Sequence, residues 1–226
     1  MSYEALLQGY QKICGEFKEF YAIARQLVKK DAKEKLIRGY AILYSDLIYK
    51  PDFLFIGINP NAGDPERGWK AEDLEIKEQF EYVDMEDNGD SVNSLSWQTR
   101  ELFKQTKFYD QFVKAMKINL FYYATRNVKD FDQVTTILNK DNINPYAYSI
   151  EWTKRLIGLI QPKVIFCEGV RVHNLLQEYY NEKLAWNGSV SIGSLGGSIK
   201  VVSYKRRWSQ ILDKESVAVE INKLIL

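Results

Sequence analysis

The stretch FLFIGINPNAGD, residues 53–64, raises the first structural question of this chain. An apolar run from Phe53 to Ile56 leads directly into Gly57, and Asn59-Pro60 follows as a turn signal. A short, continuous apolar run ended by glycine is typical of a strand buried on both faces of a parallel sheet. The sequence therefore predicts a buried strand over 52–57. The loop after it either is only a turn that ends the strand, or it places its backbone and the side-chain amide of Asn59 against a ligand.

The rest of the chain repeats this strand signal and places helical patterns between the repeats. Three more short apolar runs lie at 118–123, 163–169 and 199–204, and helical spacing is found at 96–106, 109–116, 149–160 and 171–184. Strands that alternate with helices predict a mostly parallel sheet with both faces covered. We therefore predict an α/β fold with three layers, α/β/α, and a central four-stranded, mainly parallel sheet. Glycines in residues 186–202 predict a small hairpin leading into the last strand.

The N-terminal segment and one acidic segment depart from this alternation. Apolar residues recur at helical spacing over 3–30, and Ser2 is a possible N-cap, so we predict a long amphipathic helix there. We divide the chain into an N-terminal helical extension, 1–48, packed on the core, and an α/β domain, 49–226. Residues 64–90 carry eleven acidic side chains against three basic ones, a net charge of −8. This acidic insertion is interpreted either as a solvated surface or as a lid over the ligand of the 57–60 loop.

Bulk composition excludes several classes of function. The chain has 226 residues, and its 31 basic and 30 acidic side chains nearly cancel, so net charge gives no argument for a partner. No apolar run is long enough to span a membrane, and no signal peptide is recognisable at the N-terminus. Two distant cysteines indicate no disulfide framework and favour a cytoplasmic setting, and a single histidine argues against a histidine-based metal site. We expect no metal, no cofactor and a monomer.

The residues at the ends of the predicted strands indicate what the chain could bind. In open parallel sheets, ligands lie outside the carboxyl ends of the strands. The sequence places amides, aromatics and cations there, but no paired carboxylates, no Ser-His-Asp order and no glycine-rich phosphate loop. An amide can read the edge of a nucleobase, aromatics can stack on its face, and cations can hold phosphates. Such a set suits a pocket for a base taken out of a nucleic-acid helix.

Four segments resemble the uracil-DNA glycosylase superfamily, over roughly residues 50–210. FLFIGINPNAG resembles its first motif in the Gly-Ile-Asn-Pro form of the mismatch-specific and single-strand-selective branches. KINLFYYATRNVKDF is similar to the second-strand segment, QPKVIFCEGVRVHNLL to the third strand and its helix, and VVSYKRRWS stands where the family has its last strand and a His-Pro-Ser loop. The order and spacing of the four segments are more specific than any one of them.

The resemblance implies roles for individual residues. Asn59 takes the place of the residue that orients the attacking water, and the segment around it (Gly57, Ile58 and Pro60) would line the base pocket. Asn119 takes the place of the residue that reads the base edge. The family also stacks an aromatic ring on the base. Both Trp69 and Trp97 are candidates for that ring, and the sequence leaves the choice open.

The last motif departs from the family pattern. Lys205 stands where the histidine would be, and Arg206-Arg207 replace Pro-Ser. If the protein is active, we expect Lys205 to stabilise the departing base as the histidine does in the family. The expected DNA-binding residues are Arg126, Tyr204, Arg206, Arg207 and Trp208. Two cysteines cannot hold the four-cysteine iron–sulfur cluster of some branches.

The expected function is that of a monofunctional DNA glycosylase, which hydrolyses the N-glycosidic bond of uracil or a related damaged base, with DNA carrying a flipped base as partner. Two alternatives stay open. One is a catalytically silent member that binds nucleic acid or a free base. The other is a small-molecule α/β enzyme or a protein-interaction domain. The sequence does not indicate which base is preferred.

Overall fold

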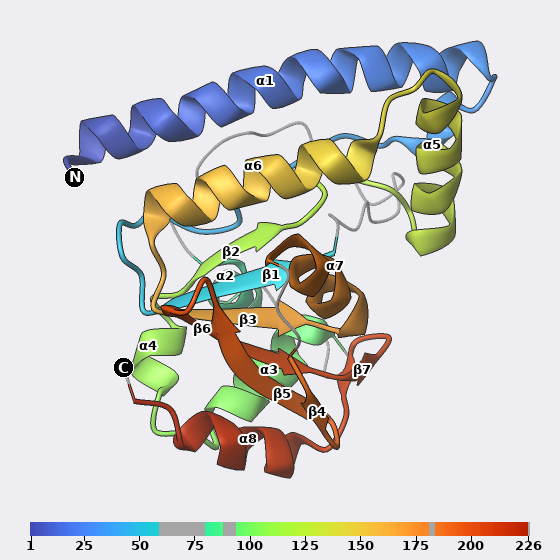
Figure 1. Ribbon diagram of the computed structural model, residues 1–226. Coiled ribbons are helices and arrows are strands. Elements are labelled where there is room, and N and C mark those ends of the chain that lie inside the picture. Colours follow the sequence, from blue (N-terminus) through green and yellow to red (C-terminus); the bar gives the residue numbers. More distant parts are fainter. Residues whose placement is uncertain (59–79, 88–93, 181–183, 226) are drawn as a thin grey trace. The chain divides into compact units, whose positions relative to one another are not determined.

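The computed structural model describes residues 1–58, 80–87, 94–180 and 184–225, and these form two compact units (Figure 1). The first unit contains residues 1–42, 58 and 119–159. The second contains the described residues of 43–57, 80–118 and 160–225. This grouping differs from the predicted division after residue 48, because the N-terminal helix packs with a segment from the middle of the chain.

The first unit is built on α1, Tyr3–Lys30, whose predicted bounds are confirmed. The Ser2 hydroxyl accepts a hydrogen bond from the Ala5 N–H at 3.3 Å, which satisfies one of the donors at the start of the helix. At the other end Ala32 has φ +55°, and the Lys33 N–H reaches the Val28 carbonyl at 3.0 Å. This reversal ends the helix and leads into the short helix η1, Glu34–Leu36.

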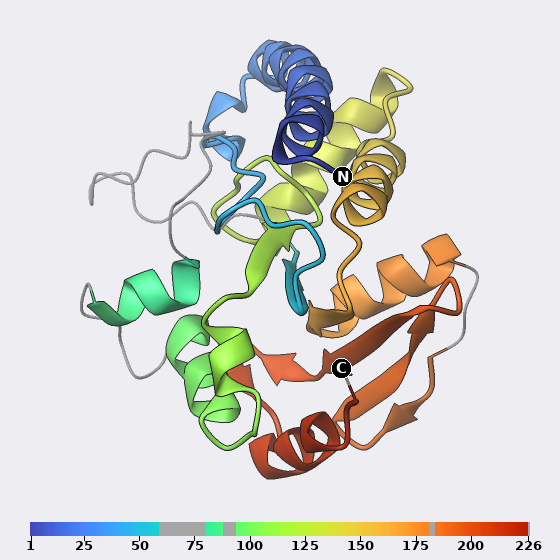
Figure 2. The same cartoon turned by 90° about the vertical axis from the view of Figure 1, so that its left-hand side faces the viewer.

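Helix α1 packs along α6, Pro145–Ile160, and the two lie side by side in both views (Figure 1 and Figure 2). Phe17 is fully buried between them, with its ring centre 5.6 Å from that of Trp152 and 5.4 Å from that of Tyr122. At the edge of this contact, the Arg155 guanidinium donates to the Glu16 carboxylate. Helix α5, Val128–Lys140, begins at the N-cap Asn127 and packs near the end of α1.

The second unit contains a mixed sheet in the order β2-β1-β3-β6-β5-β4. The strands are β1 Phe53–Gly57, β2 Met116–Asn119, β3 Val164–Glu168, β4 Trp186–Asn187, β5 Val190–Leu195 and β6 Ile199–Tyr204. The pairs β1–β3 and β3–β6 are parallel, whereas β6–β5 and β5–β4 are antiparallel.

The prediction of a four-stranded, mainly parallel sheet is therefore wrong in its strand number and in its mixture of directions, although the α/β class is confirmed. The predicted hairpin forms, but it belongs to the sheet. Gly196 and Gly197 take φ +58° and +73°, and Gly188 takes +60°, values that favour glycine. These reversals bring β5 along the whole of β6 and add β4 outside it, which extends the sheet on one side.

Helices cover both faces of this sheet within the second unit (Figure 1). Alternate residues of the strands, such as Phe55, Phe166 and Val202, face a core shared with α3 Leu95–Phe103, α4 Tyr109–Phe112 and α8 Lys214–Asn222. The other face carries α7, Val170–Tyr180, where His173 contacts Ser203 of β6. The remaining elements are α2 Glu81–Asp87 and a small hairpin of β7 Arg206–Arg207 and β8 Gln210–Ile211.

The second predicted strand, 118–123, is displaced toward the N-terminus. Strand β2 covers Met116–Asn119. The apolar residues that follow are fully buried. Their backbone does not continue the strand but forms hydrogen bonds with the backbone of residues 38–41. The Ala41 N–H donates to the Tyr122 carbonyl at 2.8 Å, and the Ala124 N–H donates to the Gly39 carbonyl at 2.7 Å. Apolar composition predicted burial here correctly, but not the conformation.

Across the described ranges, no helix has the length and apolar character needed to cross a membrane. The same residues contain no group of three or more histidine, cysteine, aspartate or glutamate side chains that could hold a metal ion.

The aromatic core between α1 and α6 makes a testable prediction for the first unit. Phe17→Ala removes a fully buried ring, so it should lower the free energy of unfolding by about 3–5 kcal/mol. Ile23→Ala on the same helix is the control, because Ile23 is 48% exposed and its truncation should change stability by less than about 0.5 kcal/mol. Urea unfolding followed by circular dichroism measures both. Equal, small effects of the two substitutions would contradict the packing of α1 on α6.

Candidate functional site

The strand order places a topological switch point between β1 and β3. From β1 the chain continues to β2 on one side, and later to β3 and β6 on the other side. Open α/β sheets bind ligands in the crevice at such a point, outside the carboxyl ends of the strands. Strand β1 ends at Gly57 and β3 ends at Glu168. The Gly-Ile-Asn-Pro part of the first motif, which starts at Gly57, therefore begins where this fold class places its ligands.

The segments that leave β1 and β2 meet just beyond the two strands. The Phe121 N–H donates to the Ile58 carbonyl at 2.9 Å. Asn119, the last residue of β2, is 5% exposed. A carboxamide can both donate and accept hydrogen bonds, and this one lies at the carboxyl end of a strand, where open α/β sheets bind their ligands. Asn119 is thus a candidate for binding a polar group.

Three predicted site residues, Asn59, Pro60 and Trp69, lie outside the described residues. The roles that the resemblance implies for these three residues therefore stay predictions. Trp97 lies in α3, where the Ser94 hydroxyl caps the helix by accepting from the Trp97 N–H at 3.0 Å. The ammonium of Lys214 from α8 lies 5.0 Å from the centre of the Trp97 ring.

A buried charged network, which the sequence reasoning did not single out, lies at the end of β3. Glu168 is 1% exposed, and its carboxylate accepts a hydrogen bond from the Tyr82 hydroxyl. The Lys117 ammonium donates to the same hydroxyl at 2.5 Å and lies 3.6 Å from the Glu168 carboxylate. Glu81 supplies a second carboxylate 3.1 Å from Lys117. The network links β2, β3 and the start of α2.

The chemistry of the network is that of a fixed structural support. Burial, helped by the neighbouring Glu168 charge, raises the pKa of Tyr82 well above its ordinary value. The hydroxyl therefore stays protonated and donates to the carboxylate, while it accepts from Lys117. A signal for this network existed in the sequence, since Lys117 and Glu168 each interrupt an apolar strand. A charge in a fully buried strand needs a partner of opposite sign. Two opposite charges in buried strands are therefore expected to pair with each other.

Arg206 is held against the backbone at the same end of β3. Its Nε donates to the Glu168 carbonyl at 2.9 Å, and its Nη1 donates to the Trp208 carbonyl at 2.9 Å. The guanidinium packs on Gly169, where a Cβ would lie 3.2 Å from Nε and where φ is +109°. Arg206 forms no ion pair with a carboxylate of the described residues, so its charge is oriented but not neutralised.

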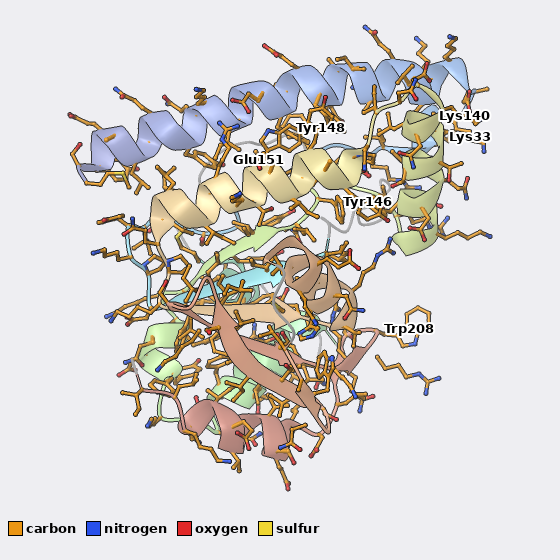
Figure 3. The ribbon with its side chains drawn as sticks, in the orientation of Figure 1. Lys33, Lys140, Tyr146, Tyr148, Glu151 and Trp208 are labelled. Carbon is orange, nitrogen blue, oxygen red and sulfur yellow. The ribbon has the colours of Figure 1, made fainter. Side chains whose placement is uncertain are left out.

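The hairpin of β7 and β8 presents cationic and aromatic groups to solvent. Trp208 is 86% exposed at the turn, with φ +59°, and Figure 3 shows its ring projecting from the hairpin. Arg207 beside it is also exposed. Tyr204, in contrast, is fully buried in the core, so its side chain has no surface with which to contact DNA. Arg126 is exposed in the first unit, directly before the N-cap of α5.

Lys205 does not face the end of β1. Its N–H donates to the Ser189 carbonyl at 2.8 Å, and its ammonium lies 5.1 Å from the centre of the Trp186 ring. Trp186 belongs to β4 at the sheet edge, whereas β1 lies on the opposite side of β6, beyond β3. The side chain expected to replace the family histidine thus points away from the switch point, whereas Arg206 of β7 bonds to the backbone at the end of β3.

The only histidine of the chain is a packing residue. His173 is 1% exposed, its Nδ1 lies 2.9 Å from the Ser203 hydroxyl, and its ring centre lies 4.5 Å from that of Trp186. Burial lowers the pKa of His173 below its usual value. The imidazole is therefore neutral at pH 7 and is enclosed between α7 and the sheet.

A scan against protein-family models finds none that matches this chain, and a search of curated proteins finds no match either. We therefore infer a function from the geometry of the strand ends and from the chemistry of the residues found there.

The buried network makes a prediction about stability. Lys117→Met leaves the Glu168 carboxylate buried without its cation, which should lower the free energy of unfolding by about 3 kcal/mol. The control Lys114→Met removes an exposed ammonium from the loop before β2 and should cost less than about 0.5 kcal/mol. Adding Glu168→Gln to Lys117→Met should cost less than the sum of the two single substitutions. Simple additivity in urea unfolding would show that Lys117 and Glu168 are not coupled.

His173 makes a prediction about pH. A folded-state pKa below that of the unfolded chain means that the unfolded state binds more protons between the two values. Stability should therefore decrease as the pH falls below about 6.5, and His173→Gln should remove that part of the dependence. The single imidazole also gives one clear set of NMR signals, whose titration midpoint should lie below 6.5. A midpoint at or above 6.5 would contradict the buried placement of this side chain.

Proposed function

We propose that this protein is a DNA base glycosylase, which hydrolyses the bond between a deoxyribose and uracil or a related damaged base. The observation that carries the proposal is the position of the Asn119 carboxamide, which lies at the end of β2 at 5% exposure. An amide presents a donor and an acceptor side by side, as does the edge of a pyrimidine base. Its position agrees with the role that the family resemblance implies for it.

The proposed site discriminates between bases through this amide. A base with the matching edge satisfies both polar groups of Asn119, whereas a mismatched edge leaves them buried and unpaired. Sites built to hydrogen-bond a ligand reject analogues that lack the matching group strongly, because the desolvation cost is not recovered. The main chain after Gly57 follows β1 to the same end of the sheet, as the hydrogen bond from Phe121 to Ile58 indicates.

The reaction itself needs few protein groups. The C1′–N bond breaks, its electron pair leaves with the base, and water adds to the oxocarbenium-like sugar. The proton that this water loses neutralises the released base anion, directly or through solvent. Asn59, by resemblance, would position this water, since an amide is too weak a base to remove its proton. Electrostatic donors directed at growing charge are often the largest catalytic contribution. Among the basic residues after β6, Arg206 is better oriented than Lys205 to face a departing anion at the switch point.

DNA would be held by the hairpin that follows β6. Arg207 and Trp208 are exposed there, and Arg206 fixes the turn through the Trp208 carbonyl. Cations bind phosphates, and an exposed indole can stack on an unpaired base. This surface supports the proposed contact of Arg206, Arg207 and Trp208 with DNA.

A second candidate function is binding of nucleic acid without excision. The specific observation in its favour is the position of Lys205, whose ammonium lies over Trp186 and away from the end of β1. Without a donor for the departing base, the protein would recognise a flipped base but leave the glycosidic bond intact.

Single-turnover excision from uracil-containing single- and double-stranded oligonucleotides tests the proposal. The wild type should release uracil, and Asn119→Ala should reduce the rate about 100-fold, because one oriented hydrogen-bonding group is removed. Asn187→Ala, at an exposed position of β4, should leave the rate unchanged. Equal rates for wild type and Asn119→Ala would exclude Asn119 as the reader of the base. Binding of the oligonucleotides without excision of any damaged base would favour the second candidate.

A further inference from the structure

The positive charge of the first unit is concentrated in one short segment. Residues 25–38 contain six basic and two acidic side chains, a net charge of +4. The rest of residues 1–42 and 119–159 contains seven of each sign, a net charge of zero. The excess charge of these two ranges therefore lies entirely at the end of α1 and in η1, far in sequence from the hairpin of β7 and β8.

Four lysines of this segment, Lys29, Lys30, Lys33 and Lys35, form what we call the α1-end lysines. All four are exposed, and none forms an ion pair with another described side chain. The neighbouring Lys140 of α5 is different, since its ammonium lies 3.2 Å from the Asp31 carboxylate. Figure 3 places Lys33 and Lys140 at the same end of the first unit. Asp31 is thus already engaged, and the four lysines keep their charge.

The requirements of the helix explain only part of this cluster. Basic side chains in the last turn of a helix interact favourably with its dipole, which accounts for Lys29 and Lys30. Lys33 and Lys35 lie beyond the reversal at Ala32 and gain nothing from that interaction. Four ammonium groups that have no ion-pair partner among the described side chains repel each other, and a bound anion would relieve this repulsion.

The surroundings of the cluster favour one class of anionic partner. Surface helices that bind membranes insert large apolar side chains between the lipids. None of the large apolar side chains found exposed in the described residues belongs to 25–38. A cluster of cations without apolar anchors fits instead a partner with a regular row of charges in water, such as the phosphate backbone of a nucleic acid.

We propose that the α1-end lysines are a second phosphate-binding surface, which contacts the backbone of the nucleic-acid substrate. This inference rests on the proposed function for its partner. The contact that it supplies is independent of the nucleotide sequence and comes from the first unit alone. Each phosphate neutralised releases counterions, so the surface should appear in the salt dependence of binding.

Fluorescence anisotropy with a labelled duplex that lacks uracil tests this surface in the full-length protein. The variant Lys29→Gln/Lys30→Gln/Lys33→Gln/Lys35→Gln should bind at least about tenfold more weakly at about 0.1 M salt. Its slope of log K against log salt should fall by roughly 0.9 for each phosphate that the variant no longer neutralises. The matched control Lys12→Gln/Lys18→Gln/Lys107→Gln/Lys114→Gln also removes four exposed lysines, and it should keep the wild-type affinity and slope.

The outcomes separate this inference from the proposed function. If the wild type binds the duplex and only the α1-end variant loses affinity, the surface is established, whether or not uracil is excised. If the α1-end variant binds as the wild type does, or if both four-lysine variants weaken binding equally, the inference is wrong even when excision is observed.

Sedimentation with vesicles that contain phosphatidylcholine and phosphatidylserine in equal amounts tests a membrane as the alternative partner. Vesicle binding that depends on these lysines, without binding to the duplex, would overturn the assignment to nucleic acid.

Discussion

The contact of the Lys117 ammonium with the Tyr82 hydroxyl and the Glu168 carboxylate is the interaction on which the strand ends of the second unit depend. It joins β2, the start of α2 and the end of β3, and all three side chains are nearly inaccessible to solvent. Charges in such surroundings are tolerated only when paired and hydrogen-bonded, so the three elements cannot separate without a large cost. The backbone of Glu168 is thereby fixed, and its carbonyl in turn orients Arg206. A single buried network thus sets the position of a cation at the switch point of the sheet.

Local sequence rules predicted those parts of the fold that local interactions determine. Helix α1 has a cap at Ser2, a continuous apolar stripe and a reversal after Lys30, and its bounds were predicted correctly. Strands β1, β3 and β6 were found from short apolar runs, because both of their faces are buried. The number of strands in the sheet was not predicted. The sequence predicted the hairpin at Gly196-Gly197, but not that its first strand, β5, pairs with β6 as part of the sheet.

The candidate site was less predictable, because it depends on side-chain direction and on distant partners. The burial of Asn119 follows from the strand pattern, but the end of β2 does not, because the predicted strand ran to residue 123 and β2 ends at Asn119. The direction of Lys205 follows from a contact with Trp186 on a strand that was not predicted as part of the sheet. Tyr204 was expected at the surface, but its place in β6 turns its ring into the core. The partners Tyr82 and Lys117 are 35 positions apart, and no local rule joins them.

The proposed function requires that the carboxamide of Asn119 receives the edge of a nucleobase. The most direct measurement follows the side-chain amide signals of ¹⁵N-labelled protein during titration with free uracil, with the Asn119 signal assigned by its loss in Asn119→Ala. We expect this signal to shift progressively with uracil concentration, and the signal of the exposed Asn187 amide to stay in place. An Asn119 signal that stays in place while other side-chain amides shift would show that Asn119 does not bind the base.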